Sequence, residues 1–304
     1  MRRFVKRLFQ LALLFILSLI LGLSAIAIST RFTLKIEQKT LGHQTHWGSS
    51  WERISEFETW VKQNSTQQKG LILGSSTAYR NLNPYALDSA TNLNWFNYAS
   101  SGQPPVISYQ LLQHAFSLGK FKVVLLDIYA PVVKLDGLET AHDLIYNSQL
   151  NWWNKTKMLC SYPEGKLWLR YLYYYIKKML PARQYIIEDP KNGTYLKKGF
   201  VCSNQEALTN FKQKAKNQKV PNFPELLKIA ALCKANGAQL ILNITPSLEG
   251  PFELPKAFND HPVIQIKNFN EPSLFYDSHH MTCQGANLYS ALVAGQLAKI
   301  LHSK

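Results

Sequence analysis

A serine after the first buried-looking apolar run and an Asp-x-x-His segment near the end of the chain carry the side chains that nucleophilic catalysis needs. Ser76 follows Gly70-Leu-Ile-Leu-Gly-Ser75, where an apolar run stops and helix-compatible residues begin. Asp277 precedes His280 by three residues, which lets the carboxylate orient the imidazole. A serine, a base and an acid that orients the base fill the roles of a Ser-His-Asp triad. The predicted chemistry is acyl transfer, in which His280 takes the proton of Ser76 while the serine attacks an ester carbonyl.

The elements that must position these residues are those of an α/β fold. Apolar runs alternate with amphipathic segments, which predicts a parallel sheet with helices on both faces. Strands are expected near 70–74, 94–98, 122–128 and 239–244, and helices from about 78 and over 104–118, 224–236 and 284–301. Ser76 would then lie at the carboxyl end of the first strand, where open α/β sheets place their chemistry.

Four short blocks of the chain, spread over about residues 70–301, resemble the SGNH/GDSL hydrolase superfamily, apart from a large central insertion. Gly74-Ser75-Ser76 is similar to the family's first block, which makes Ser76 the implied nucleophile. Asp277 and His280 match its last block, Asp-x-x-His, with His279 as the fallback base. The resemblance implies a three-layer α/β/α fold with a parallel sheet.

The other two blocks concern the oxyanion hole. Asn97-Tyr-Ala-Ser-Ser-Gly102-Gln resembles the second block, so the N–H groups of Ser76 and Gly102 are the implied oxyanion donors. The third block departs from the family pattern Gly-x-Asn-Asp, because the segment 123–131 contains no asparagine. Losing one such donor typically costs on the order of 10²–10³ in rate. Tyr129 and Ser75 are candidate replacements, from their expected positions at strand ends.

Relatives with a Gly-Ser-Ser turn and a degenerate third block resemble membrane-anchored proteins of bacterial envelopes. The resemblance therefore implies a serine esterase or O-acyltransferase that acts on an acylated envelope glycan or lipid. A second class stays open, because the altered third block would also permit a non-catalytic binding or assembly protein that keeps the fold. Neither class needs a cofactor or a metal.

The amino terminus predicts the compartment. Arg2, Arg3, Lys6 and Arg7 precede residues 8–28, which carry no charge and are long enough to cross a bilayer core. Positive residues stay on the cytoplasmic side, so the rest of the chain is expected outside the cytoplasm. Cleavage of a signal peptide after Ala27 is the alternative to an uncleaved anchor. The predicted organisation is a basic tip and anchor over 1–30, a juxtamembrane linker over 31–68 and the α/β domain over 69–304.

An insertion at about 132–220 carries much of the chain's net charge of +15. Residues 151–220 hold 14 Lys and Arg against 4 Asp and Glu, with Trp152, Trp153 and a tyrosine-rich run over 168–175. Cationic and aromatic side chains together are typical of an element at a membrane interface or on an anionic envelope polymer. The alternative is a packed helical subdomain with solvated lysines. Nucleic acid is not an expected partner, because the domain is expected outside the cytoplasm.

The four cysteines are too few for a disulfide scaffold, and they lack the paired spacing of a zinc site. In an oxidising exterior Cys160 and Cys202 could bridge the insertion. Cys233 is expected in the core on the apolar face of a helix, and Cys283 is expected to pack rather than react.

Overall fold

The computed structural model describes residues 2–41, 50–135, 137, 140–141, 144, 150–160, 193–211, 218–220, 223–255, 258 and 260–303. The chain divides into two compact units, one made of Met1–His46 and Tyr162–Ile187 and the other of Trp47–Ser161 and Glu188–Lys304. The second unit contains every residue of the candidate triad.

The second unit is built on a five-stranded parallel sheet with the strand order β2-β1-β3-β7-β9. Leu71 at the middle of β1 pairs with Phe96 of β2 on one side and with Val124 of β3 on the other. Every residue of β1 and β3 is buried, as expected for parallel strands covered on both faces. The strands are β1 (Lys69–Leu73), β2 (Asn94–Asn97), β3 (Val123–Ile128), β7 (Gln239–Ile244) and β9 (Val263–Gln265).

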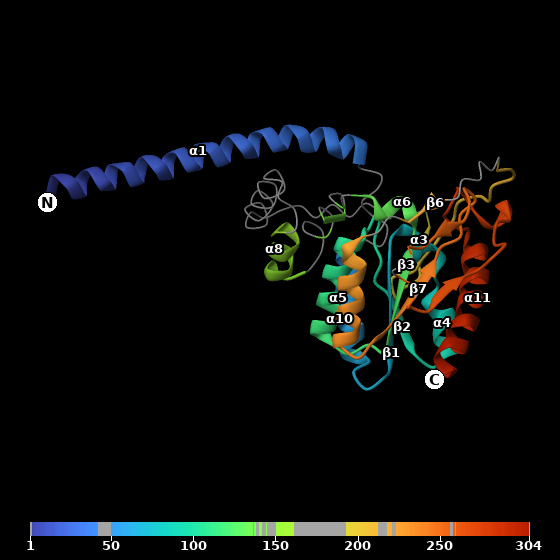
Figure 1. Cartoon of the computed structure of the whole chain (residues 1–304). Helices are drawn as coiled ribbons and strands as arrows, with labels where there is room; N and C mark the ends of the chain where they lie inside the picture. Colours follow the sequence, from blue (N-terminus) through green and yellow to red (C-terminus); the bar gives the residue numbers. More distant parts are fainter. Residues whose placement is uncertain are drawn as a thin grey trace. The chain divides into compact units, whose positions relative to one another are not determined.

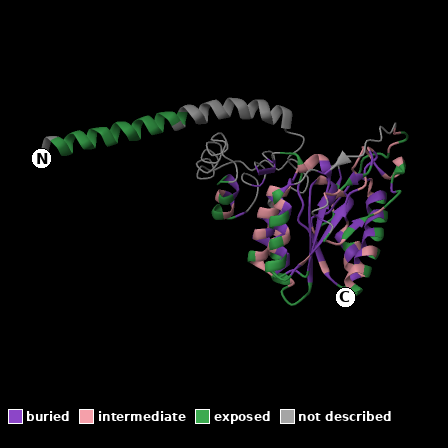
Figure 2. Ribbon diagram, viewed as in Figure 1, coloured by how far each residue is buried: buried purple, intermediate pink, exposed green. Residues whose placement is uncertain are grey.

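Helices cover both faces of this sheet, which confirms the predicted α/β class. Figure 1 shows α5 (Pro105–Leu118) and α10 (Pro224–Ala235) on one face and α4 (Pro84–Thr91) and α11 (Cys283–His302) on the other. The buried residues line the sheet and the inner sides of these helices (Figure 2). The remaining elements are short: α3 (Ser76–Asn81), α6 (Ala130–Val133), α8 (Trp152–Cys160), β4 (Thr194–Tyr195), β5 (Val201–Cys202), β6 (Gln218–Lys219), β8 (Phe252–Glu253) and η2 (Pro272–Leu274).

The prediction of a linker over 31–68 is wrong for the second half of that range, because α2 (Ser50–Gln63) packs in the core. Phe57 is fully buried, and its ring stacks on Tyr98 with centroids 4.0 Å apart. Trp60 of the same helix packs on Phe96. The helix uses a narrow apolar stripe between charged residues, so its burial is less evident in the sequence than that of the strands.

The first unit contributes α1 (Arg2–Leu41), whose residues Phe4–Gly22 have a mean hydropathy of 2.1. Among the described residues this is the one helix long and apolar enough to cross a membrane, and a signal sequence would satisfy the same criterion. Its described side chains are exposed rather than packed in a protein core. An apolar amino-terminal helix is therefore present, as predicted, and it continues beyond residue 30.

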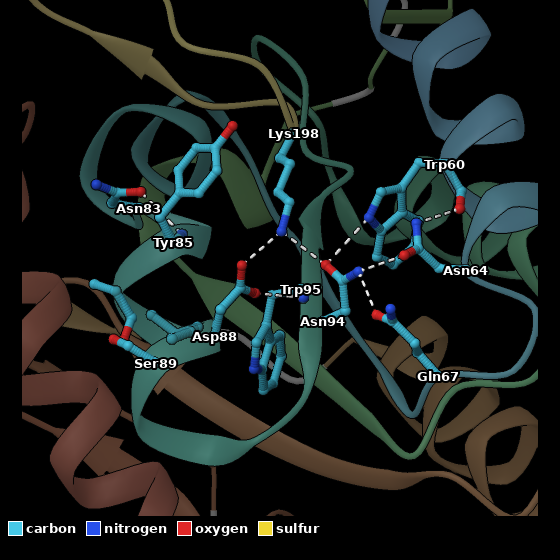
Figure 3. A network of polar contacts seen from close by, with 12 residues as sticks. Trp60, Asn64, Gln67, Asn83, Tyr85, Asp88, Ser89, Asn94, Trp95 and Lys198 are labelled. Atoms are coloured by element: carbon cyan, nitrogen blue, oxygen red, sulfur yellow. Dashed lines mark hydrogen bonds and ion pairs between the residues drawn. The ribbon is translucent and has the colours of Figure 1, made fainter.

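A hairpin of the insertion, β4 and β5, covers the edge of the sheet at β2. The N–H of Asn97 donates to the carbonyl of Lys198 in the hairpin turn. The ammonium of Lys198 donates to Asp88 at 2.5 Å and to Asn94 at 2.7 Å, as Figure 3 shows. Its side chain is 18% exposed and lies over the ring of Tyr85. Lys198 therefore anchors the insertion to the domain instead of joining a solvated basic face, while the run over 168–175 lies outside the described residues.

Candidate active site

Ser76 occupies the turn between β1 and α3. Gly74 ends the strand with φ +151°, and a Cβ there would lie 2.8 Å from the Cβ of Asp127 on β3, so a side chain does not fit. Ser75 is the N-cap of α3, and its hydroxyl accepts from the N–H of Thr77. Both Ser75 and Thr77 are buried, whereas Ser76 between them is partly exposed. The turn thus presents the Ser76 hydroxyl at the carboxyl edge of the sheet.

The structure brings Ser76, His280 and Asp277 together as the sequence predicted. The Ser76 hydroxyl lies 2.8 Å from Nε2 of His280, and Nδ1 of His280 lies 2.6 Å from Oδ2 of Asp277. A carboxylate that accepts from Nδ1–H leaves Nε2 as the acceptor for the serine proton. The other carboxylate oxygen, Oδ1, accepts from the backbone N–H groups of His280 and His279. Asp277 therefore fixes both the ring and the backbone of the histidine loop.

The environment keeps Asp277 ionised. Burial alone would raise its pKa, but the hydrogen bond and the charge of His280, with smaller contributions from His279, hold the pKa well below its usual range. The carboxylate is thus available to stabilise an imidazolium at His280.

His279, the fallback base, lies beside the triad but faces other groups. Its Nδ1 hydrogen-bonds with the hydroxyl of Ser278 at 2.9 Å, and its ring stacks on Tyr129 with centroids 4.6 Å apart. Burial, and then the charge of His280, lower the pKa of His279 to about 4. His279 is therefore neutral at neutral pH and forms a wall of the site, so the structure favours His280 as the base.

Asn81, which the sequence analysis did not single out, holds the histidine loop from the end of α3. Its Nδ2 donates to the carbonyl of His279 at 2.9 Å, and its Oδ1 accepts from the N–H of Met281 at 2.9 Å. Both residues that flank His280 are thus bound by one buried amide. In the sequence, Asn81-Leu-Asn-Pro84 is typical of an ordinary turn, so nothing in the pattern points to this role.

The carbonyl of Ser278 is held from the opposite direction. It accepts from the N–H of Leu248 at 2.8 Å and from the hydroxyl of Ser247 at 3.1 Å, both in the segment after β7. The loop that carries Asp277 and His280 is therefore bound to two separate parts of the domain.

The implied oxyanion donors have free N–H groups within the described part of the chain. No described residue accepts a hydrogen bond from the backbone N–H of Ser76 or of Gly102. Gly102 has φ +56°, a left-handed conformation that suits glycine, in the loop after β2. The carbonyl of Ser101 beside it accepts from the buried Thr140 hydroxyl at 2.7 Å, which helps to fix this loop.

The hydroxyl of Ser75, one of the two candidates for a third oxyanion donor, is not free to act as one. Thr77 donates its hydroxyl proton to Asp127 at 2.7 Å, so the Ser75 hydroxyl at 2.9 Å must donate to Thr77. The Ser75 proton is therefore used inside the protein. Tyr129 stays a candidate donor, because burial, followed by the charges of Glu249 and Asp277, raises its pKa and keeps its hydroxyl protonated.

Asp127, at the end of β3 in the segment 123–131, has a structural role beside the site. Its buried carboxylate accepts hydrogen bonds from Thr77 on α3, from Asn243 at 2.6 Å and from Thr245. Burial raises its pKa, and these three hydrogen bonds offset part of that effect. Asp127 thus ties the first turn of α3, and with it Ser76, to β3 and to the end of β7.

One group of residues has the composition of a metal site and coincides with the triad. Ligand atoms of Asp277, His279 and His280 lie within 4.8 Å of one another. Both ring nitrogens of His280 already hydrogen-bond to protein atoms, so a metal would have to displace Ser76 or Asp277. That the reaction at this site needs no metal stays a prediction.

The pairing of Cys160 with Cys202, which the sequence left open as a possibility, does not occur. Cys202 of β5 forms a disulfide with Cys283, the first residue of α11, with Cα atoms 4.9 Å apart. Cys160 is exposed and free, whereas Cys233 is buried and free, as predicted. The sequence pattern could not show that the hairpin of the insertion returns next to the start of α11. The disulfide therefore ties the insertion to a position three residues after His280.

A small cavity is lined by residues next in sequence to the candidate donors, but not by Ser76, Gly102 or His280 themselves. It measures about 20 Å³, as the space open to the centre of a water-sized sphere. Ser75, Gln103, Tyr129 and Phe223 are among its lining residues, so it borders the chain neighbours of both Ser76 and Gly102. A volume of this size holds little more than one water molecule, because one such molecule needs about 10–15 Å³ on the same measure.

A scan against models of protein families matches no family, and a search of curated proteins finds no match for this chain. The function is therefore argued from the site itself.

Proposed function

We propose that this protein is a membrane-anchored, extracytoplasmic serine esterase or O-acyltransferase of the SGNH/GDSL type. The observation that carries the proposal is the hydrogen-bonded series Ser76, His280 and Asp277 at the carboxyl edge of a parallel sheet. One nitrogen of the His280 ring hydrogen-bonds to the Ser76 hydroxyl at 2.8 Å and the other to the Asp277 carboxylate at 2.6 Å. Ordinary surface turns do not form such a connected series.

In the proposed reaction, Oγ of Ser76 attacks the ester carbonyl carbon while its proton passes to Nε2 of His280. The N–H groups of Ser76 and Gly102 stabilise the oxyanion of the tetrahedral intermediate. Its collapse breaks the ester bond, and the departing alcohol takes the proton from His280. Water or a sugar hydroxyl then attacks the acyl-serine, returns a proton through His280 and frees Ser76.

The substrate class follows from the anchor. An apolar amino-terminal helix preceded by basic residues supports an anchor with the domain outside the cytoplasm, where acylated glycans and lipids of the envelope are available. Such esters need no cofactor for their hydrolysis.

The proposal is tested by acetate release from an acetylated glycan and from a small acetyl ester, with the full chain in detergent or nanodiscs. Ser76→Ala and His280→Gln should each lose activity. His279→Gln should keep most of it, because His279 hydrogen-bonds to Ser278 whereas His280 is the histidine bonded to Ser76. Equal activity of Ser76→Ala and the wild type would contradict the esterase.

A non-catalytic binding or assembly protein is the second candidate, favoured by one observation. The segment 123–131 carries the structural Asp127 and no asparagine, whereas members of the SGNH/GDSL superfamily have a donor asparagine in the corresponding block. Saturable binding of an acylated glycan by Ser76→Ala and the wild type alike, with no turnover by either, would favour this candidate.

A further inference from the structure

Two adjacent tryptophans on α8 are among the most exposed large apolar side chains that the described residues contain outside α1. Trp152 is 64% exposed and Trp153 is 55% exposed. Tryptophan is usually well buried in a soluble domain, so two neighbouring exposed rings indicate a surface that meets a partner. Their centroids lie 5.5 Å apart in an edge-to-face arrangement, so they form one patch.

The rest of α8 shows that this exposure is one-sided. Met158 and Leu159 are buried, and α8 packs on α5. The opposite face carries Trp153, Lys157 and Cys160, which are exposed and follow one another at helical spacing. The ammonium of Lys157 lies 5.8 Å from the centre of the Trp153 ring. The helix, Trp152–Cys160, contains no acidic residue.

We infer that this face of α8, defined by Trp153 and Lys157 with the ring of Trp152 beside it at the start of the helix, docks on the headgroup layer of the membrane that anchors the chain. Tryptophan rings prefer the level of the lipid headgroups, because their ring is apolar and their N–H needs a polar partner. The positive charge of Lys157 beside the Trp153 ring complements anionic lipids. The inference rests on the membrane anchorage in the proposed function.

The anchor also explains why so small a patch is sufficient. A domain tethered to a bilayer meets its surface at a high effective concentration, so a weak contact of two rings and one ammonium is populated. Docking would restrict the orientation of the domain, and with it the direction from which an envelope substrate reaches Ser76.

Cys160 offers a direct test, since the other three cysteines are buried or form the disulfide. The full chain is reconstituted in vesicles that contain anionic lipid, and Cys160 is labelled with an environment-sensitive fluorophore. A nitroxide attached to lipids near the headgroup should quench this fluorophore, and a nitroxide near the chain end should quench it less. Trp152→Ala with Trp153→Ala should abolish the quenching and shift the emission to longer wavelength.

The matched control is Leu292→Cys in a Cys160→Ser background, because Leu292 is 43% exposed on α11. A fluorophore there should escape quenching. Equal quenching at both positions, no quenching at Cys160, or unchanged quenching in the double variant would each overturn the inference. A shift of the Cys160 emission by a soluble acidic polysaccharide, without quenching by lipid, would instead assign the patch to a polymer.

Two further measurements separate this inference from the proposed function. Failure of the wild type to float with the vesicles would overturn both the anchor and the docking face. If Ser76→Ala loses turnover while the quenching at Cys160 is unchanged, the result supports the esterase. The docking face is then supported by the quenching alone and does not depend on the activity.

Discussion

Asn81 hydrogen-bonds to the backbone on both sides of His280, although Asn81 lies near the start of the domain sequence and His280 near its end. One amide donates to the carbonyl of His279 and accepts from the N–H of Met281, each at 2.9 Å. Because Asn81 ends the same short helix that Ser76 begins, it relates the position of the nucleophile to that of its base. It acts through His280 and is a positioning residue.

Replacing Asn81 by Ala should lower the rate at which a fluorophosphonate labels Ser76 by about tenfold or more, since small displacements of reacting groups are costly. The matched control is Asn83→Ala, which removes a helix cap and an amide contact with Asn287 on the same side of the domain. Both variants should lose stability, at about 1 kcal/mol for the cap, but only Asn81→Ala should lose reactivity and shift its pH profile. Equal labelling rates in the two variants would make Asn81 a purely structural residue.

The stability of the domain should fall on mild acidification because of the buried His114 and the partly buried His279. Burial lowers the pKa of His114 to about 4, and burial with the charge of His280 lowers that of His279 to about 4. The unfolded chain takes up these protons first, so the stability is fully present above the ordinary pKa of 6.5 and is lost between there and about 4. Each histidine should contribute a slope of about 1.4 kcal/mol per pH unit in this window.

Urea unfolding followed by tryptophan fluorescence at several pH values measures this slope. His114→Gln should flatten it while keeping a polar partner for the buried hydroxyl of Tyr98. The same slope in His114→Gln and the wild type would exclude His114 as a cause.

The disulfide makes a separate prediction. Peptide mapping under non-reducing conditions should find Cys202 joined to Cys283 and should find Cys160 alkylated. Reduction should destabilise the domain by about 2–5 kcal/mol, and Cys202→Ser with Cys283→Ser should reproduce the loss. Recovery of a peptide that joins Cys160 to Cys202 would contradict the structure at this point.

The sequence was sufficient for the central strands and for the triad, and the reasons are physical. The strands β1, β3 and β7 are continuous apolar runs, and a parallel sheet places their carboxyl ends together, so Ser76 was predicted at the correct edge. Asp277 and His280 needed only a short local spacing. Their meeting with Ser76 followed from the order of the blocks along the chain.

What the sequence could not predict depends on contacts between distant segments. The core role of α2 arises from rings of β2 that Phe57 and Trp60 meet only in the folded domain. The pairing of Cys202 with Cys283 depends on where the hairpin of the insertion returns. Asn81 and Asp127 are ordinary polar residues in the sequence, and burial beside the site gives them their roles.

If His280 activates Ser76 as a nucleophile, a serine-reactive probe should modify Ser76 and no other serine. The full chain is treated with a fluorophosphonate, and the modified peptide is identified by mass spectrometry in the wild type, Ser76→Ala and His280→Gln. We expect a single adduct on Ser76, none on Ser75, no adduct in Ser76→Ala and a labelling rate reduced by about 10²-fold or more in His280→Gln. Labelling that persists in Ser76→Ala, or an adduct that maps to another serine in the wild type, would exclude Ser76 as the nucleophile.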